Sequence, residues 1–284
     1  MDNLQKIKLL CQAYNIFPSR QKGQNFLVNE KVIEQTVAAS DLSNNDLVLE
    51  VGPGLGILTE ALVQKAKRVV SVELDKKLFS LLKGKFAGVS NLELVEGDIL
   101  KIDPLTHDLK PNSYKIVANL PYNITSHFLK KFLSGSNKPL VMTLLLQKEV
   151  AQRICAQPGQ MSLLAISVQL YGQPQIIGLV SNNNFWPKPK IDSAILKISK
   201  IKTLDEVDNY LSGVSEKIFW QIVRIGFSAK RKQLQNNLAA GLHVPSDEIK
   251  KALKQANFDP KVRAQDLAVV DWIKLAKKLD SYLN

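Results

Sequence analysis

The sequence predicts an α/β protein with a mostly parallel, doubly wound sheet, followed by a small all-helical domain. Up to about residue 200, short apolar runs rich in β-branched residues alternate with longer helical stretches, as in repeated strand–helix units. After about Lys202 the strand patterns end and apolar residues recur at helical spacing. Hydrophobic residues make up 45% of the 284 positions and charged residues 23%, which is ordinary for a folded protein. We therefore expect a first domain over residues 1–203, including an N-terminal lead-in, and a helical domain over residues 204–284.

Five strands are expected in the first part of the chain, at Leu47–Val51, Val69–Val72, Leu92–Val95, Ile116–Ala118 and Leu140–Leu146. Their nearly continuous apolar character is typical of strands that are covered on both faces. Helical stretches such as Leu55–Lys65 and Leu78–Phe86 lie between them. Two further strands are expected at Gln175–Val180 and Ser193–Ile198, separated by an Asn- and Pro-rich loop at Asn182–Lys190.

In the second domain, six apolar residues mark two helical faces: Ile218, Ile222, Ile225, Val269, Ile273 and Ala276. Gly241, Pro245 and Pro260 interrupt this region, and we expect them to separate helices. No strand pattern occurs after about Lys202, so the domain is expected to be all-helical.

The charge balance favours an anionic partner such as nucleic acid or an acidic membrane surface, because the chain has 38 Lys and Arg but only 26 Asp and Glu, a net charge of +12. Cys11 and Cys155 are the only cysteines, so no disulfide framework or zinc cluster is expected, and free thiols fit a reducing compartment. No apolar run approaches the roughly 18 residues of a membrane span. We expect a monomeric cytoplasmic protein that does not contact membranes.

Residues Glu50–Gly56 form a glycine-rich turn between the first predicted strand and the next helix. Glycines allow a tight turn and a close approach of the backbone to a ligand. The spacing of Gly52, Gly54 and Gly56 differs from the Gly-x-Gly-x-x-Gly spacing of dinucleotide sites. Pro53 also removes a backbone N–H that a pyrophosphate would use. The turn favours a ligand without phosphates, although glycines that serve only packing would give the same pattern.

Two acidic residues follow neighbouring strands: Glu73 ends the second strand and Asp98 follows the third. Because the carboxyl ends of parallel strands line the ligand crevice, both are expected beside the glycine turn. A carboxylate at Glu73 can accept both hydroxyls of a ribose. Each acid alone is better explained as a solvated strand end or a helix cap. Their occurrence in order after the glycine turn favours a nucleoside site.

The tetrapeptide Asn119-Leu120-Pro121-Tyr122 follows the fourth predicted strand. Outside this context it would be a strand-ending turn, because Asn and Pro are common turn formers. Together with the glycine turn, Gln24-Asn25-Phe26-Leu27 and the segment Phe185–Ala194, it resembles the class I S-adenosylmethionine-dependent methyltransferases. The combination is most similar to the ribosomal RNA adenine dimethyltransferases of the KsgA/RsmA type. The resemblance runs from about Lys22 to the C-terminus, and the four motifs occur in the family's order.

This resemblance implies a Rossmann-like domain that binds S-adenosylmethionine and needs no metal ion. The donor-binding residues that it implies are Asn25, Leu27, Gly52, Gly54, Glu73, Asp98 and Asn119. In this interpretation Gly52 contacts the methionine portion, Glu73 the ribose and Asp98 the adenine amino group. For Asn25 to Leu27, an N-terminal segment that merely packs on the domain is a simpler alternative.

The residues assigned to catalysis are Asn119, Leu120, Pro121, Tyr122 and Phe185. The N6 amine of adenine is a poor nucleophile because its lone pair is delocalised into the ring. Acceptors on both N–H groups, the Asn119 side-chain oxygen and the Leu120 carbonyl, would favour a more pyramidal and more nucleophilic nitrogen. Pro121 stiffens the turn. Tyr122 offers a flat face to an extruded base, and Phe185 is expected to close the other face.

Two groups of basic residues are expected to contact RNA, namely Lys188 and Lys190 beside Phe185, and Arg224, Lys230, Arg231 and Lys232 around Phe227. Basic side chains interleaved with aromatic ones suit a phosphate backbone with bases nearby. A solvated basic face explains the second group equally well.

The resemblance implies N6,N6-dimethylation of two adjacent adenosines in a hairpin near the 3′ end of small-subunit (16S) ribosomal RNA, within a partly assembled subunit, as a step in its biogenesis. The Erm enzymes, which methylate large-subunit RNA, are the closest alternative. A non-catalytic assembly factor and a nicotinamide-dependent oxidoreductase are the others. Leu120 and the long helical domain favour the small-subunit activity, the intact Asn119–Tyr122 motif favours catalysis, and the glycine spacing disfavours NAD. Gln265 departs from the family pattern, because many relatives have Glu there.

Overall fold

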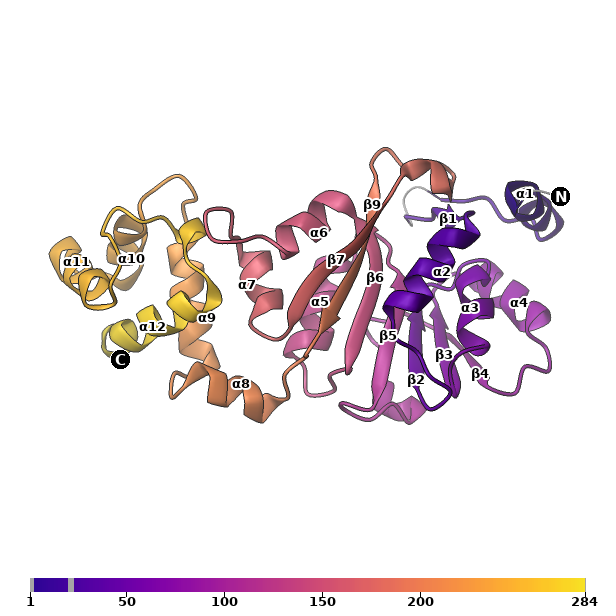
Figure 1. Cartoon of the computed structure of the whole chain (residues 1–284), viewed down its shortest axis with the longest axis horizontal. Coiled ribbons are helices and arrows are strands. Elements are labelled where there is room, and N and C mark those ends of the chain that lie inside the picture. Colours follow the sequence, from indigo (N-terminus) through magenta and orange to yellow (C-terminus); the bar gives the residue numbers. More distant parts are fainter. Residues whose placement is uncertain (1–2, 20–22, 284) are drawn as a thin grey trace. The chain divides into compact units, whose positions relative to one another are not determined.

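The computed structural model describes residues 3–19 and 23–283, which form two compact units (Figure 1). The sheet unit consists of Met1–Ala151 and Gln173–Ile201, and the helical unit of Gln152–Gly172 and Lys202–Asn284. The chain thus leaves the sheet unit once, over residues 152–172, and then returns to it. We had placed this excursion in the first domain. Its backbone bonds to the helical unit instead, since the amides of Gly159 and Met161 donate to the Gln265 carbonyl at 2.9 and 3.0 Å.

The sheet unit is built on seven strands in the order β4-β3-β2-β5-β6-β9-β7. Their bounds are β2 (Leu47–Val51), β3 (Arg68–Glu73), β4 (Leu92–Glu96), β5 (Tyr114–Asn119), β6 (Val141–Gln147), β7 (Gln173–Val180) and β9 (Ser193–Ser199). The first five strands in that order are parallel, and β9 and β7 are antiparallel additions at one edge. The structure confirms the predicted α/β class and every predicted strand within one to two residues. Only the inner strands are covered on both faces, because β4 and β7 lie at the two edges and are partly exposed.

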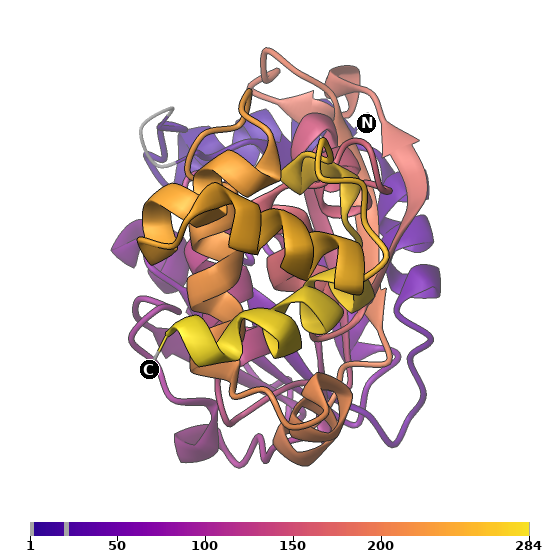
Figure 2. The same ribbon diagram turned by 90° about the vertical axis from the view of Figure 1, so that its left-hand side faces the viewer.

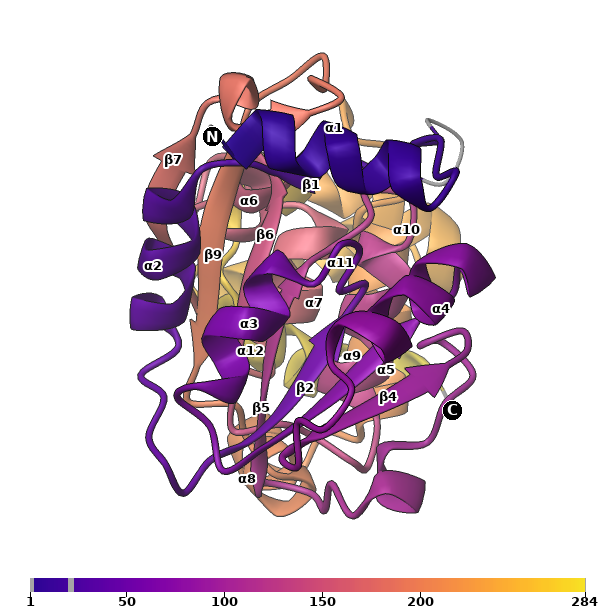
Figure 3. The ribbon, with the colours of Figure 1, turned by 90° about the vertical axis from the view of Figure 1, so that its right-hand side faces the viewer.

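Helices cover both faces of this sheet (Figures 1 and 3). Their bounds are α1 (Asn3–Ala13), α2 (Glu30–Ala39), α3 (Ile57–Val63), α4 (Lys76–Lys85) and α5 (Thr125–Ser134), with short 3-10 turns at Pro104–His107 and Asn182–Asn184. Leu62 of α3 packs with Val69 and Val117 of the sheet. On the opposite face, the rings of Phe128 and Phe132 of α5 lie 4.7 Å apart. Within the described ranges, no helix is long and apolar enough to cross a membrane.

A second, two-stranded sheet joins distant parts of the chain. Here β1 (Phe26–Leu27) pairs antiparallel with β8 (Phe185–Trp186), so that Phe26 lies opposite Trp186 and Leu27 opposite Phe185. The segment that we expected to be a loop at Asn182–Lys190 therefore contains a short strand. A strand of two residues has no alternating period, so the sequence pattern could not reveal it.

The helical unit contains α7 (Leu163–Gln169), α8 (Leu204–Leu211), α9 (Glu216–Gly226), α10 (Leu234–Leu242), α11 (Ser246–Gln255) and α12 (Val269–Leu279), with 3-10 turns at Ala264–Asp266 and Asp280–Tyr282. Figure 2 shows α9 to α12 in orange and yellow, and α6 (Lys148–Ile154) leads into the unit. The expected helical faces lie in α9 and α12, where Trp272 is fully buried. Gly241 does not separate helices, contrary to our expectation. It lies inside α10, where an added Cβ would come within 2.5 Å of Ile225.

Candidate functional site

A cavity of about 260 Å³ opens at the carboxyl ends of β2, β3, β4 and β5. Its wall consists of the glycine turn, the ends of β3 and β5, the turn after β4, and β1 with the residues just before it. All the predicted donor-binding residues lie in this wall: Asn25, Leu27, Gly52, Gly54, Glu73, Asp98 and Asn119. Of the residues assigned to catalysis, Asn119 and Pro121 line the cavity. Because these side chains come from five separate segments, the fold has gathered them at one edge of the sheet.

The glycine turn has a backbone that glycine accommodates and other residues resist. Gly52, Gly54 and Gly56 have φ values of 64°, 59° and 76°, all in the left-handed region. A Cβ on Gly54 would also lie 3.2 Å from the Phe26 ring. A Cβ on Gly56 would lie 2.6 Å from Phe86, which belongs to the core behind the turn. Gly56 therefore serves packing, whereas Gly52 and Gly54 shape the cavity wall.

Glu73 is held rigidly at the end of β3. Its Oε2 accepts a hydrogen bond from the Gly54 amide at 3.1 Å, and its Oε1 accepts one from the Asp75 amide at 2.8 Å. Burial raises the pKa of the Glu73 carboxyl, while these backbone donors oppose the rise. Each carboxylate oxygen has two lone pairs, so both oxygens can still accept a further donor. The carboxylate is thus suited to hold a ligand with two neighbouring hydroxyls.

Glu50 is a second buried carboxylate in the cavity wall, and it is not among the site residues predicted from the sequence. Its Oε2 accepts hydrogen bonds from Thr59 Oγ1 at 2.8 Å and from the Ser71 hydroxyl. Its Oε1 is buried and has no hydrogen-bond partner among the described residues. Burial raises the pKa of Glu50 to about 7. An acidic residue inside an otherwise apolar central strand, Leu47–Val51, is the signal that would have identified it.

Asp98 lies in the turn after β4. Its Oδ1 accepts a hydrogen bond from the Leu100 amide at 2.9 Å, so the side chain also stabilises this turn. Both interpretations of Asp98 that the sequence allows, a turn-capping residue and a ligand-facing residue, are compatible with this placement. Among residues 3–19 and 23–283, no group of three His, Cys, Asp or Glu side chains is placed to hold a metal ion.

The segment after β5 joins the cavity to the second sheet. Asn119 Nδ2 donates to the Asn25 carbonyl at 3.2 Å, across 94 positions of sequence. Among the described residues, no hydrogen-bond donor reaches the Asn119 side-chain oxygen, which leaves this acceptor available to a ligand. The Leu120 side chain is buried and its amide donates to the Leu145 carbonyl at 3.0 Å, so only its own carbonyl can serve a ligand.

The aromatic residues of the predicted site are placed differently from one another. The Tyr122 hydroxyl lies 3.0 Å from Ser193 Oγ at the start of β9, and burial raises its pKa. Phe185 is buried in a cluster with Leu27 and Ile195 and does not line the cavity. In this structure, therefore, Phe185 supports β1 from behind, and its expected role as a cover for the base remains a prediction.

The predicted RNA-binding residues are all exposed. Lys188 and Lys190 lie in the loop after β8 on the sheet unit. This loop is fixed by Asn182, whose amide donates to Asp192 Oδ1 at 3.0 Å and whose Nδ2 donates to the Pro189 carbonyl at 3.2 Å. The other four, Arg224, Lys230, Arg231 and Lys232, lie at the end of α9 and in the turn before α10 on the helical unit.

The aromatic residue that lies beside these four basic residues is not free to stack on a base. Phe227 packs against Trp272, with ring centroids 5.5 Å apart. The exposed basic side chains, and not this ring, are therefore what the group presents to an anionic partner. Gln265, the departure from the family pattern, also has a structural role. Its side-chain Nε2 donates to the Gly159 carbonyl at 2.9 Å, a bond that a glutamate at this position would not donate.

Comparisons with known proteins agree with this geometry. A family model described as "Ribosomal RNA adenine dimethylase" matches residues 19–281. A Dehalococcoides mccartyi (strain CBDB1) protein named "Ribosomal RNA small subunit methyltransferase A" is 42% identical over 268 residues, covering 94% of this chain and 90% of that protein. The crystal structure of a dimethyladenosine transferase from Plasmodium falciparum superposes with a TM-score of 0.76 at 27% identity, covering 90% of this chain and 98% of that chain. The 23S rRNA methyltransferase ErmE superposes with a TM-score of 0.73 at 27% identity, covering 90% and 100%.

Proposed function

Because the chain belongs to the ribosomal RNA adenine dimethylase family, we propose that it dimethylates N6 of two adjacent adenosines in small-subunit ribosomal RNA, using S-adenosylmethionine. One observation carries this function: a single cavity at the strand ends holds every predicted donor-binding residue and has Asn119 and Pro121 in its wall. The donor cavity and the start of the acceptor motif are therefore continuous.

The small subunit is favoured over the large one by sequence similarity. The relative with 42% identity is named as a small-subunit methyltransferase, whereas the large-subunit enzyme ErmE is 27% identical. The fold does not distinguish the two activities, since the TM-scores are 0.76 and 0.73. The position of the two adenosines, in a hairpin near the 3′ end, follows from the family resemblance.

The residues of the cavity fit S-adenosylmethionine. Glu50 Oε1, buried and without a partner among the described residues, suits the ammonium group of the methionine portion. The free lone pairs of the Glu73 oxygens suit the two ribose hydroxyls, and Asp98 suits the adenine amino group. Gly52 and Gly54 leave the methionine side of the wall without side chains. When bound, this donor supplies an electrophilic methyl group on a positively charged sulfur.

The residues after β5 prepare the acceptor amine. The Asn119 side-chain oxygen and the Leu120 carbonyl accept the two N–H groups of N6, which localises the lone pair and directs it into the cavity. Pro121 fixes its own φ and keeps these acceptors in place. Tyr122 offers a face for the extruded base, with its ring tethered by the hydrogen bond to Ser193. No strong general base is needed, because water takes the released proton.

Charge brings the RNA to the site. We assign the exposed Lys188 and Lys190 of the sheet unit and the four basic residues of the helical unit to phosphate contacts. The proposed substrate is RNA within a partly assembled small subunit, and the protein is proposed to act as a cytoplasmic monomer without a metal ion or a membrane contact.

The test is transfer of labelled methyl groups from S-adenosylmethionine to purified, unmethylated ribosomal subunits, each offered separately, followed by nucleoside analysis. We expect N6,N6-dimethyladenosine at two sites of the small subunit. Product found only in the large subunit would refute the choice of substrate, and donor binding without any transfer would refute catalysis.

A further inference from the structure

Helix α1 (Asn3–Ala13) precedes the residues that the family model matches, 19–281, and contains none of the predicted site residues. Even so, it is tightly packed. Ile7 and Cys11, one helical turn apart, are 4% and 3% exposed, and Ile16 just after the helix is 6% exposed. Burial also raises the pKa of the Cys11 thiol. An N-terminal segment with three buried anchors is not a loose tail.

The end of α1 is built to return the chain to the core. Asn15 has a φ of 53°, its amide donates to the Gln12 carbonyl at 3.2 Å, and the Ile16 amide donates to the Cys11 carbonyl at 2.8 Å. This pair of bonds is a Schellman motif, in which a left-handed residue ends the helix and the next residue makes an apolar contact with its last turn. Ile16 and Cys11 make this contact, since both belong to one buried cluster.

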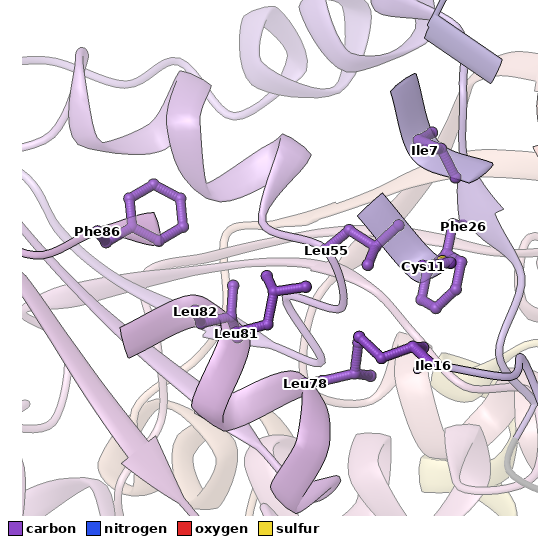
Figure 4. Close-up of a cluster of buried hydrophobic side chains, with 9 residues drawn as sticks. All are labelled: Ile7, Cys11, Ile16, Phe26, Leu55, Leu78, Leu81, Leu82 and Phe86. Carbon is purple, nitrogen blue, oxygen red and sulfur yellow. The ribbon is translucent and has the colours of Figure 1, made fainter. Parts of the chain in front are cut away.

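That cluster, drawn in Figure 4, shares three residues with the wall of the donor cavity. Phe26, Leu55 and Leu78 belong to the cluster and also line the cavity. Figure 4 shows Ile7 and Cys11 on the side of Phe26, with Ile16 directed toward Leu78. These three residues therefore belong both to the cavity wall and to the cluster that contains the anchors of α1.

Polar contacts continue the same connection. Lys77 Nζ of α4 donates to the Asn15 carbonyl at 3.2 Å, which ties the end of α1 to the helix that carries Leu78. Gln24 Nε2 donates to Asp75 Oδ2 at 3.4 Å, and the Asp75 amide donates to Glu73 at 2.8 Å. The segment that follows α1 thus reaches the carboxylate assigned to the ribose through a single intervening residue.

We propose that Ile7, Cys11 and Ile16 are positioning residues of the S-adenosylmethionine site, which hold Phe26, Leu55 and Leu78 in their donor-binding arrangement. This inference rests on the proposed function, because it assumes that the cavity binds the donor. Phe26 carries the effect to the glycine turn, since its ring lies where a Cβ on Gly54 would meet it at 3.2 Å.

The physical reason is preorganisation. Large apolar side chains that lose their packing on one side sample additional arrangements, including ones that fill the cavity. Donor binding must then select the competent arrangement, and the apparent dissociation constant rises by the inverse of its population. The anchors are buried and do not line the cavity, so we expect the effect to be confined to the donor's dissociation constant and KM.

The experiment compares S-adenosylmethionine binding, by titration calorimetry, between the full-length protein and its Ile7→Ala/Ile16→Ala variant. We expect the dissociation constant to rise about tenfold, which corresponds to about 1.4 kcal/mol. In steady-state assays the KM for the donor rises by the same factor, while kcat at saturating donor and the KM for RNA are unchanged. The conservative Ile7→Val/Ile16→Val variant restores most of the affinity.

Two matched controls separate positioning from general stability. Leu9→Ala changes an exposed residue of the same helix, 52% exposed, and leaves donor affinity unchanged. Val69→Ala truncates a fully buried residue of the same unit that does not line the cavity, so it lowers the unfolding temperature without raising the dissociation constant.

A wild-type dissociation constant for the donor in the double alanine variant, or an equal rise of that constant in Val69→Ala, overturns the inference. If the alanine variant does not fold, the valine variant decides, with an expected rise of about twofold in the dissociation constant, about 0.4 kcal/mol. Absence of donor binding in the wild-type protein refutes the proposed function instead.

Discussion

The donor cavity and the loop that carries Lys188 and Lys190 hold their polar groups in opposite ways. In the cavity, Glu50 and Glu73 are buried, and each accepts two hydrogen bonds from the protein. In the loop, the lysines are exposed, and only the backbone around them is fixed, through Asn182. Buried carboxylates act at contact distance and need exact placement, whereas exposed ammonium groups act through their charge. Substitutions in the cavity are therefore expected to have large, local effects, and those in the loop small, salt-dependent ones.

The largest effect is expected at Asn119, which ends β5 and lines the donor cavity. Asn119→Ala removes an acceptor from the N6 amine, and loss of one preorganised polar group at a reacting centre commonly costs about 10²–10³ in kcat. Affinity for RNA stays within about twofold of wild type, because most of it comes from phosphate contacts. Single-turnover methylation and filter binding measure the two quantities. Equal losses in both would show that Asn119 acts mainly by holding the RNA.

The buried carboxylates make the second prediction, which concerns pH. Burial raises the pKa of Glu50 from 4.5 to about 7 in the folded protein, and the pKa of Glu73 is raised for the same reason. A carboxyl with a raised folded pKa favours the folded state at low pH, and this contribution is lost as pH rises through about 7. For Glu50 alone the loss is about 3 kcal/mol, at about 1.4 kcal/mol per pKa unit.

The measurement is thermal unfolding of the donor-free protein between pH 5 and pH 8. Glu50→Gln is expected to be more stable than wild type at pH 8 and to lose less stability with rising pH. Donor affinity is expected to change with pH in the opposite direction to stability. In wild type it rises with pH, because the ionised Glu50 holds the donor's ammonium group. In Glu50→Gln it is low throughout. If donor affinity changed with pH in the same way in wild type and in Glu50→Gln, Glu50 would not belong to the donor site.

Glu73→Gln is expected to raise the dissociation constant for S-adenosylmethionine by about 10- to 100-fold, because hydrogen bonds to a charged group contribute about 1.5–3 kcal/mol. Glu96 provides a matched control. It lies opposite Glu73 on the neighbouring strand and ends that strand, but it is exposed and does not line the cavity. Calorimetry on Glu96→Gln should give the wild-type constant. A similar loss in both variants would point to general electrostatics in place of a ribose contact.

The sequence could predict features that depend on local patterns, but not those that depend on contacts between distant segments. The strands follow from local patterns, and so does the gathering of the glycine turn, Glu73 and Asp98, since a parallel sheet brings its strand ends to one edge whatever the loops between them do. The other donor-binding residues are implied by the family resemblance. The partner of β1 and the packing of α1 depend on contacts between distant segments, which leave no local period. Residues 152–172 belong to the helical unit through contacts with distant residues, among them the bonds to Gln265 and the hydrogen bond from Trp220 Nε1 to the Tyr171 hydroxyl.

Phe185 and Glu50 show the limit for single residues. Phe185, an aromatic residue beside two lysines, is expected to face a base; in this structure it lies opposite Leu27 and is buried, and its role at the base remains a prediction. Glu50 lies in an apolar strand, and the sequence indicates it only as the first residue of the glycine turn. In the structure it is buried, and its Oε1 has no hydrogen-bond partner among the described residues. Residue type predicts which chemistry is possible, and burial decides whether the side chain is available for it.

The smallest effect is expected for Lys188→Ala/Lys190→Ala. Each lysine that neutralises a phosphate contributes about 0.7–0.9 to the slope of log affinity against log salt. The double variant should therefore lower that slope by one to two, reduce RNA affinity severalfold at low salt, and approach wild type at high salt. Donor affinity is unchanged, since neither lysine lines the cavity. Lys110→Ala is the matched control, because this exposed lysine precedes β5 at the opposite end of the sheet from the cavity. If Lys110→Ala lowers the slope as much as the double variant does, the RNA responds to net charge alone, and the loop after β8 is not a docking element.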